Sequence, residues 1–359
     1  MELGMFIMPA HPIGVNPFDA AQWDLQLIKW ADELGFGEAW LGEHFCSPWE
    51  ICPAPDLIIA QALRETERIR LAPGAHLLPF HHPAELAHRV AYLDHLAQGR
   101  LMFGIGSGGL PSDWKLFNID GFSGQNREMT AEALEIILRI WTEPGEWTHE
   151  GKYWTVNKPG RMFEHLDFHM LPFQQPHPPI GVAGLNAPSP TLEMAGERGF
   201  IPMSLNLGRE YVKAHWDSVV IGAERAGRAY PDRQQWRLAK EVFIADTDEE
   251  AYELSVNGPL GAYFRDYLLP LYSQFGFLKF FKHDPSISDS EVTAEYCAEH
   301  NWIIGSPDTA AKKLRGLSEE VGGFGTLLVL GYDYSENPAV WRRSMDLLAH
   351  EVLPQLEHA

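Results

Sequence analysis

The sequence predicts an α/β fold, a (β/α)8 TIM barrel formed by a chain of 359 residues. Eight short, continuously apolar runs recur along the chain, and segments with helical periodicity separate them. Such strands are typical of parallel sheets buried on both faces, and their alternation with helices is typical of α/β proteins. The length exceeds the roughly 250 residues of a minimal barrel, which leaves room for insertions. The predicted strands cover residues 3–8, 38–41, 69–71, 100–105, 180–183, 201–205, 238–245 and 326–330.

The predicted helices carry ordinary start and stop signals. The first has an apolar face that consists of Trp23, Leu27, Trp30 and Leu34. Gly35 follows this face as a stop signal. In the second half of the chain Ser306 precedes Pro307, which is the arrangement of an N-cap with proline in the first turn. The closing helix repeats the apolar spacing with Trp341, Met345, Leu348 and Val352.

Two segments exceed a minimal barrel, one after strand four and one after strand seven. Residues 142–179 are rich in proline, histidine and aromatic residues and link strand four to strand five. Residues 257–302 separate strands seven and eight and carry too many aromatic residues for a solvated loop. Insertions after barrel strands lie on the catalytic face, so we interpret 257–302 as a lid and substrate wall; a packing element or a dimer contact is the alternative. No internal repeat or low-complexity linker is evident, and residues 1–359 are expected to form a single domain.

Composition excludes several function classes. The chain has 28 basic and 49 acidic residues, and its net charge of −21 would repel a nucleic-acid backbone. Cys46, Cys52 and Cys297 are few and odd in number, which favours free thiols in a reducing compartment. No apolar run approaches the roughly 18 residues of a membrane span, and the N-terminus lacks the basic segment of a signal peptide. A cytoplasmic protein without a membrane or nucleic-acid partner is therefore expected.

The glycines after strand four have two interpretations. Gly104, Gly106 and Gly109 form a GxGxxG pattern, which is typical of a dinucleotide site when it opens a helix near the start of a βαβ unit. Here the pattern lies in mid-chain and Leu110-Pro111 follows it. We favour a strand end where the backbone must approach a flat ligand closely, because side chains would prevent that approach.

Glu43 and His44 follow strand two, where a barrel residue reaches the active-site mouth. Histidine exchanges protons near neutral pH, so His44 suits acid–base catalysis; a structural histidine is the alternative. His76, His81 and His82 are a third feature, but adjacent side chains diverge and no HExxH pattern accompanies them. We therefore expect no metal site.

The loop 184–191 follows strand five and precedes a predicted helix. Hydroxyls and free amides at a helix N-terminus form a phosphate-binding device, and Ser189 and Thr191 supply such hydroxyls. Plain helix capping by either residue is the alternative.

Several blocks together resemble the bacterial-luciferase-like flavin monooxygenases. They include Gly-Phe-Gly-Glu-Ala-Trp-Leu-Gly-Glu-His, His-Leu-Leu-Pro-Phe-His-His-Pro, Gly-Arg-Leu-Met-Phe-Gly-Ile-Gly-Ser-Gly-Gly, Pro-His-Pro-Pro-Ile-Gly-Val-Ala-Gly-Leu and Phe-Ile-Ala-Asp-Thr-Asp-Glu-Glu-Ala. The resemblance covers nearly the whole chain. Within the family, Trp49-Glu50 after Glu-His and the segment 302–307 are most similar to members of the diketocamphane and limonene monooxygenase type.

The resemblance implies a two-component enzyme. Such enzymes take reduced FMN from a separate reductase and use O2 to oxygenate an apolar small molecule. The resemblance favours Baeyer–Villiger oxidation of a cyclic ketone. The alternatives are terpene epoxidation or hydroxylation, alkanal oxidation, a deazaflavin-dependent oxidoreductase and a non-catalytic flavin-binding subunit. A homodimer through the helices after the early strands is also implied, for which Trp23, Trp30 and Trp40 are available unless the core uses them.

The resemblance also implies site residues. It places His44 beside the reaction centre and a non-proline cis peptide near Gly74–Ala75. One departure concerns the phosphate: the luciferase α-subunit has an arginine where this chain has Ser107, so Ser189, Thr191 and backbone amides must hold more of the phosphate. The implied flavin contacts are Met8, Gly74, Ala75, Gly106, Ser107, Gly184, Leu185, Ser189, Pro190 and Thr191.

Overall fold

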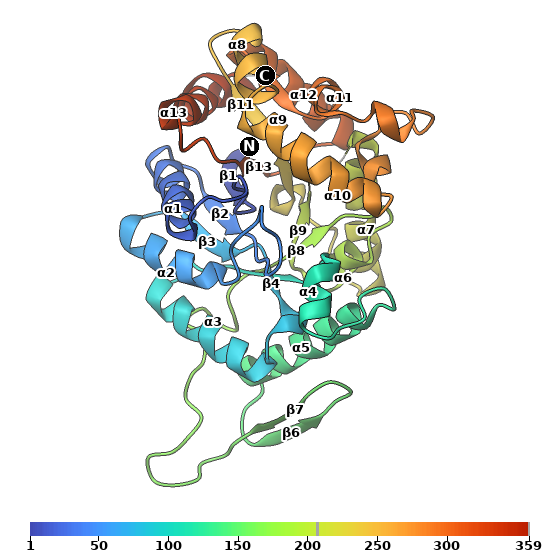
Figure 1. The fold of residues 1–359 in the computed structure, drawn as a ribbon. Coiled ribbons are helices and arrows are strands. Elements are labelled where there is room, and N and C mark those ends of the chain that lie inside the picture. The colour runs from blue at the N-terminus through green and yellow to red at the C-terminus, as the bar shows by residue number, and fades with distance from the viewer. Residues whose placement is uncertain (206–207, 358–359) are drawn as a thin grey trace.

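The computed structural model describes residues 1–205 and 208–357, and its centre is a parallel barrel (Figure 1). The main sheet has the order β3-β2-β1-β13-β10-β9-β8-β5-β4. Its strands are β1 (Glu2–Ile7), β2 (Glu38–Leu41), β3 (Arg70–Pro73), β4 (His76–Leu77), β5 (Phe103–Gly106), β8 (Ile180–Gly184), β9 (Ile201–Ser204), β10 (Arg237–Lys240) and β13 (Thr326–Gly331).

The third barrel strand consists of two segments, and together they close the ring. β3 pairs with β2, β4 pairs with β5, and a parallel bridge joins Leu71 to Leu101. The peptide bond Gly74–Ala75 between the two segments is cis, as the resemblance implied. Counted this way the barrel has eight strands, so the predicted (β/α)8 fold is confirmed.

The register brings all carboxyl ends of these strands to one mouth. Ile7 at the end of β1 pairs with Leu41 of β2 and with Gly331 of β13. Helices surround the barrel: α1 (Pro17–Glu33), α2 (Pro55–Glu65), α3 (Pro83–Ala97), α5 (Gln125–Thr142), α6 (Pro190–Arg198), α7 (Arg209–Arg225), α12 (Pro307–Val321) and α13 (Pro338–Leu347). Most of them begin at a proline, whose missing N–H costs nothing in the first turn. In the part of the chain that the structure describes, no helix is both long and apolar enough to span a bilayer.

Strand seven differs from the sequence-based prediction. The apolar run 238–245 is divided: β10 ends at Lys240, and β11 (Val242–Ile244) pairs instead with β12 (Ile303–Gly305) in a separate two-stranded sheet. Both segments are buried throughout. The charged pair Lys240-Glu241 interrupts the predicted strand at the point where the chain leaves the barrel.

The segment 142–179 is the predicted insertion between the fourth and fifth barrel strands, β5 and β8. It comes after α5, which has already returned the chain to the amino ends of the strands. It forms an antiparallel hairpin of β6 (Trp147–Glu150) and β7 (Thr155–Lys158), followed by irregular chain. Figure 1 shows the hairpin projecting beyond α3 and α5.

The segment 257–302 is a compact helical unit that packs on the barrel. It contains α9 (Pro259–Tyr263), a π-helical turn (Phe264–Leu268), α10 (Leu269–Gln274) and α11 (Ala294–His300). Phe264 and Phe281 are completely buried and belong to the same apolar cluster as Leu3 and Val352. This continuity supports our proposal that the chain is one domain.

Candidate active site

Glycines follow or end two of the strands at the mouth of the barrel: Gly42 follows β2, and Gly106 ends β5. A Cβ on Gly42 would lie 3.0 Å from Met8 Sδ, so the ends of β1 and β2 are in contact there. A Cβ on Gly106 would lie 3.4 Å from Ala75 Cβ, which places the end of β5 against the cis peptide. Any larger residue at Gly42 or Gly106 would occupy this space. These two glycines therefore permit close contact between neighbouring strand ends.

The dinucleotide interpretation of the GxGxxG pattern does not fit the structure. A Cβ on Gly104 would collide with the Pro73 carbonyl, so this glycine permits close contact between neighbouring strands. A Cβ on Gly109 would meet nothing within 4 Å. Gly106 lies at the end of β5, against the cis peptide.

The loop after strand five shows helix capping by Ser189, one of the two roles that the sequence left open. Ser189 is buried and is the N-cap of α6: its hydroxyl accepts a hydrogen bond from Leu192 N–H at 3.3 Å. Thr191 is exposed in the first turn of α6 and is free to face a ligand. Leu185 is half-buried, and Pro190 opens the helix.

Ser107 lies beside this loop, because β5 and β8 pair with Ile105 opposite Val182. Its Oγ lies 2.9 Å from Thr130 Oγ1 on α5. Ser107 is therefore tied to a helix by a neutral hydrogen bond and offers no positive charge to a phosphate.

His44 lies between two buried carboxylates. Its Nε2 is 3.5 Å from Glu50 Oε2, and its Nδ1 is 3.6 Å from Asp113 Oδ2. The imidazole is 13% exposed, whereas Asp113 is fully buried. Burial lowers the pKa of His44, but the charges of Glu50, Asp113 and Glu43 outweigh burial and raise it above its ordinary value. The two carboxylates therefore favour the charged form of the imidazole.

Glu43 forms a separate triad with two histidines. His76 Nδ1 and His81 Nε2 each lie 2.7 Å from one of its oxygens, and His82 is exposed and apart. Burial raises the pKa of Glu43, but the hydrogen bonds from the two imidazoles outweigh it and lower the pKa to about 2. The sequence did not predict this convergence.

The same three side chains are close enough to hold a metal ion. However, Arg89 Nη2 lies 3.3 Å from His81 Nδ1, so that nitrogen must accept and the proton must be on Nε2, facing Glu43. A metal would need the opposite tautomer. We therefore interpret the triad as a hydrogen-bonded unit that fixes the residue next to His44.

The buried side chain of His11, in the loop after β1, contacts two aspartates from other parts of the chain. His11 Nδ1 lies 2.8 Å from Asp333 Oδ2, and its Nε2 lies 3.4 Å from Asp24 Oδ2. Burial lowers the pKa of His11, but the two aspartates outweigh it and raise the pKa to about 9. A charged imidazole thus ties α1 to the loop that follows β13.

Sequence reasoning located His44 and the glycines but missed the partners of His44. Glu50 was quoted only as part of a resemblance, and Asp113 lies in the short helix α4 (Pro111–Leu116). A single aspartate in a short polar helix carries no signal of its own. No pattern in the sequence connected Ser47, Tyr263 or Tyr267 with Glu50, although all three contact it.

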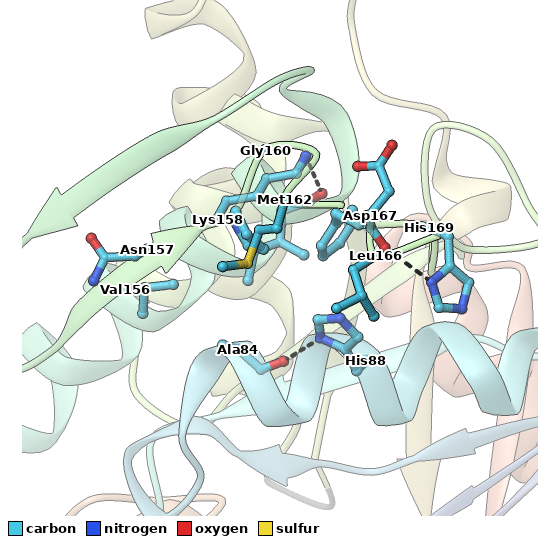
Figure 2. A pocket seen from close by; sticks show the side chains of 13 residues that line it. Ala84, His88, Val156, Asn157, Lys158, Gly160, Met162, Leu166, Asp167 and His169 are labelled. Atoms are coloured by element: carbon cyan, nitrogen blue, oxygen red, sulfur yellow. Dashed lines mark hydrogen bonds between the residues drawn. The ribbon is translucent and has the colours of Figure 1, made fainter. Parts of the chain in front are cut away.

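A distinct hollow of about 380 Å³ lies away from the mouth. It is bounded by α3 and the segment 156–169, and Figure 2 shows His88 of α3 facing Leu166 across it. No residue of the predicted flavin site lines this hollow.

An eight-stranded barrel with a histidine and two carboxylates at its carboxyl-end mouth has the architecture of an enzyme. The family model described as luciferase-like monooxygenase matches residues 1–323. The chain is 34% identical to 3,6-diketocamphane 1,6-monooxygenase of Pseudomonas putida, over 99% of this chain and 98% of that protein. It is 32% identical to limonene 1,2-monooxygenase of Rhodococcus erythropolis, over 99% of this chain and 86% of that protein.

A solved structure is similar over the same extent. It is the oxygenating constituent of 3,6-diketocamphane monooxygenase from Pseudomonas putida, a type II Baeyer–Villiger monooxygenase in complex with FMN. Its TM-score is 0.92 at 35% identity, covering 99% of this chain and 98% of that one. The chain belongs to the luciferase-like monooxygenase family and is a flavin-dependent monooxygenase.

Proposed function

We propose that the chain is the oxygenase of a two-component system that takes reduced FMN from a separate flavin reductase. The observation that carries this proposal is His44, which follows β2 and lies between the carboxylates of Glu50 and Asp113, in a member of this family. When bound, reduced FMN would supply the electrons that activate O2. The proposed contacts are Met8, Gly74, Ala75, Gly106, Ser107, Gly184, Leu185, Ser189, Pro190 and Thr191.

The residues present fit FMN in two respects. The small residues Gly74, Ala75 and Gly106 add little side-chain bulk at the strand ends where a flat ring would lie. The α6 N-terminus, with its exposed Thr191, offers backbone N–H groups to a phosphate. Because Ser107 replaces a cation and Ser189 is used as a cap, we expect oxidised FMN to bind weakly.

We propose His44 as the catalytic acid–base residue. Its raised pKa allows it to donate a proton at the reaction centre and to recover that proton later. Asp113 and Glu50 would stabilise the charged imidazole, and the largely buried setting limits access of water.

We propose Baeyer–Villiger oxidation of an apolar cyclic ketone as the reaction. Overall, a ketone, O2 and reduced flavin give a lactone, water and oxidised flavin. The similarity to 3,6-diketocamphane 1,6-monooxygenase supports this chemistry. The similarity to limonene 1,2-monooxygenase keeps terpene oxygenation as the second candidate. The relatives named above are monooxygenases, so the deazaflavin alternative finds no support in them.

The test is turnover with purified protein, a flavin reductase, NADH, FMN and a panel of bicyclic ketones and terpenes. We expect lactone from at least one ketone, dependent on both reductase and O2. Epoxide or alcohol from terpenes, with no lactone from any ketone, would assign the second candidate.

We further propose that segment 257–302 acts as a lid and substrate wall, and that the enzyme is a homodimer. Exposed apolar side chains support a contact face on α2 and α3 that includes Leu57 (64% exposed), Tyr92 (56%) and Leu96 (52%). Met162 and Leu166, next to the hollow in Figure 2, are also exposed and extend this face. Trp23 and Trp40 are buried in the core, so neither can form the dimer contact.

A further inference from the structure

Glu50 connects His44 to a distant part of the chain. Glu50 is 5% exposed, and its Oε2 faces His44 Nε2. Tyr263 donates its hydroxyl to Glu50 Oε1 at 2.8 Å, and Tyr267 donates to Oε2 at 2.7 Å. Both tyrosines belong to the segment 257–302, so each carboxylate oxygen has a donor from that segment.

Both tyrosines remain donors over the working pH range. Burial, and then the nearby charge of Glu50, raise the pKa of Tyr263 and of Tyr267 above the ordinary value. Their protons therefore stay in the hydrogen bonds to the carboxylate. Because these bonds are charge-assisted, they are stronger than bonds between neutral groups.

The backbone around Glu50 is fixed as well. Its N–H donates to Ser47 Oγ at 3.1 Å, and the Ser47 hydroxyl donates to Tyr267 at 3.0 Å. A β-bridge joins Glu50 to Ala10 in the loop after β1. The Trp49 ring stacks on Tyr267 with centroids 5.9 Å apart. Glu50 thus has little freedom to move relative to His44.

The opposite side of His44 is supported differently. Asp113 Oδ1 accepts a hydrogen bond from Cys46 N–H at 2.8 Å, and its Oδ2 faces His44 Nδ1. This support is local, because Cys46 and His44 share one loop. Only the Glu50 side connects His44 to 257–302.

We propose that Glu50 is a positioning residue for His44, and that Tyr263 and Tyr267 make the 257–302 segment part of this support. Holding the carboxylate in place keeps the imidazole oriented and charged at the mouth. This inference rests on the proposed role of His44. We assign Glu50 no direct role on substrate, because it is 5% exposed and both of its oxygens already accept tyrosine hydroxyls.

The charged groups that act on His44 are Glu50, Asp113 and Glu43. The hydroxyls of Tyr263 and Tyr267 face Glu50, and Tyr272 and Tyr332 lie near enough to feel its charge. Removing Glu50 alone leaves Asp113 and Glu43 in place. Its removal should therefore lower the His44 titration midpoint without abolishing the charge.

The test measures the ionisation of His44 directly, by NMR of histidine labelled with ¹⁵N and ¹³C, with His44→Gln used to assign the signal. An opposite charge within a few ångströms changes a pKa by about 1 to 3 pH units, so Glu50→Gln should lower the midpoint by at least about 1 unit. Tyr263→Phe/Tyr267→Phe should lower it too, because a buried carboxylate without donors turns away or takes up a proton. Glu50→Asp should restore part of the shift.

Tyr296→Phe is the matched control. Tyr296 lies in the same segment, but its hydroxyl contacts His283 and not Glu50. Its removal should leave the His44 midpoint unchanged.

An unchanged His44 midpoint in folded Glu50→Gln would overturn the positioning role. A shift in Glu50→Gln but not in the double tyrosine variant would overturn the part of the proposal that involves the segment. If the double variant does not fold, Tyr263→Phe and Tyr267→Phe separately decide this point. The measurement needs no flavin or turnover, so its failure is distinct from failure of the proposed function.

Discussion

At the residue scale, the proposed function depends on His44, because its surroundings favour the charged form of the imidazole. The position of His44 could be predicted, because a polar residue that follows a barrel strand faces the mouth. The direction of its pKa shift could not, because Glu50, further along the same loop, and Asp113, on α4, act on the imidazole through space. Charge partners of this kind leave no periodic pattern in a sequence.

His44→Ala should preserve the fold but separate oxidation of reduced flavin from oxygenation of substrate. Loss of an aligned donor in a dry site costs about 2–4 kcal/mol of transition-state stabilisation. The ratio of product to NADH consumed should fall, with hydrogen peroxide making up the difference. A variant with the wild-type ratio would contradict the assignment of His44.

The buried His11 predicts a dependence of stability on pH. Its pKa in the folded chain is about 9, above the ordinary 6.5. Its contribution is therefore complete below about pH 6.5 and is lost as pH rises through about 9. By linkage, the contribution of His11 to the free energy of unfolding is about 3 kcal/mol at most.

Urea unfolding at several pH values checks this prediction. Wild-type protein should lose stability between about pH 6.5 and 9.5, whereas His11→Gln should be less stable at the lower pH and show a smaller decline. His350→Gln, which changes an exposed histidine, should behave as wild type. Parallel curves for wild type and His11→Gln would refute the role of His11.

At the element scale, strand and helix existence followed from apolar periodicity, but connections did not. β10 and β11 lie within one predicted strand, 238–245, yet they belong to different sheets. Similarly, the composition of 142–179 indicated an insertion but not the β6–β7 hairpin, nor that residues 156–169 lie beside α3. In both cases the outcome depends on which surface the segment packs against, and that is a tertiary property.

The α6 N-terminus predicts a selective effect on ligand binding. Thr191→Ala should weaken FMN by about one to two decades, because a charge-assisted hydrogen bond contributes about 1.5–3 kcal/mol. Riboflavin lacks the phosphate and should be affected much less. Calorimetry or fluorescence titration with both ligands measures the difference, and equal losses would show that the loop contacts the ring or is structural.

At the scale of the whole molecule, the exposed face on α2 and α3 predicts a dimer. Light scattering at micromolar concentration should give twice the monomer mass of 40.5 kDa. Tyr92→Glu/Leu96→Glu places charges on this face and should shift the protein towards monomer. Tyr252→Glu changes an exposed aromatic residue on α8 (Asp248–Ser255) and should leave the dimer intact. A wild-type monomer would exclude the homodimer, and a dimer that survives Tyr92→Glu/Leu96→Glu would exclude this face.

The most direct test of the central claim is oxygen labelling during turnover. Wild-type protein, a flavin reductase, FMN and NADH are supplied with a bicyclic ketone under ¹⁸O2, and the product is analysed by mass spectrometry. The account predicts a lactone that carries one ¹⁸O atom, in the ring-oxygen position. Consumption of NADH that yields only hydrogen peroxide with every ketone tested, or an oxygenated product without label, would contradict it.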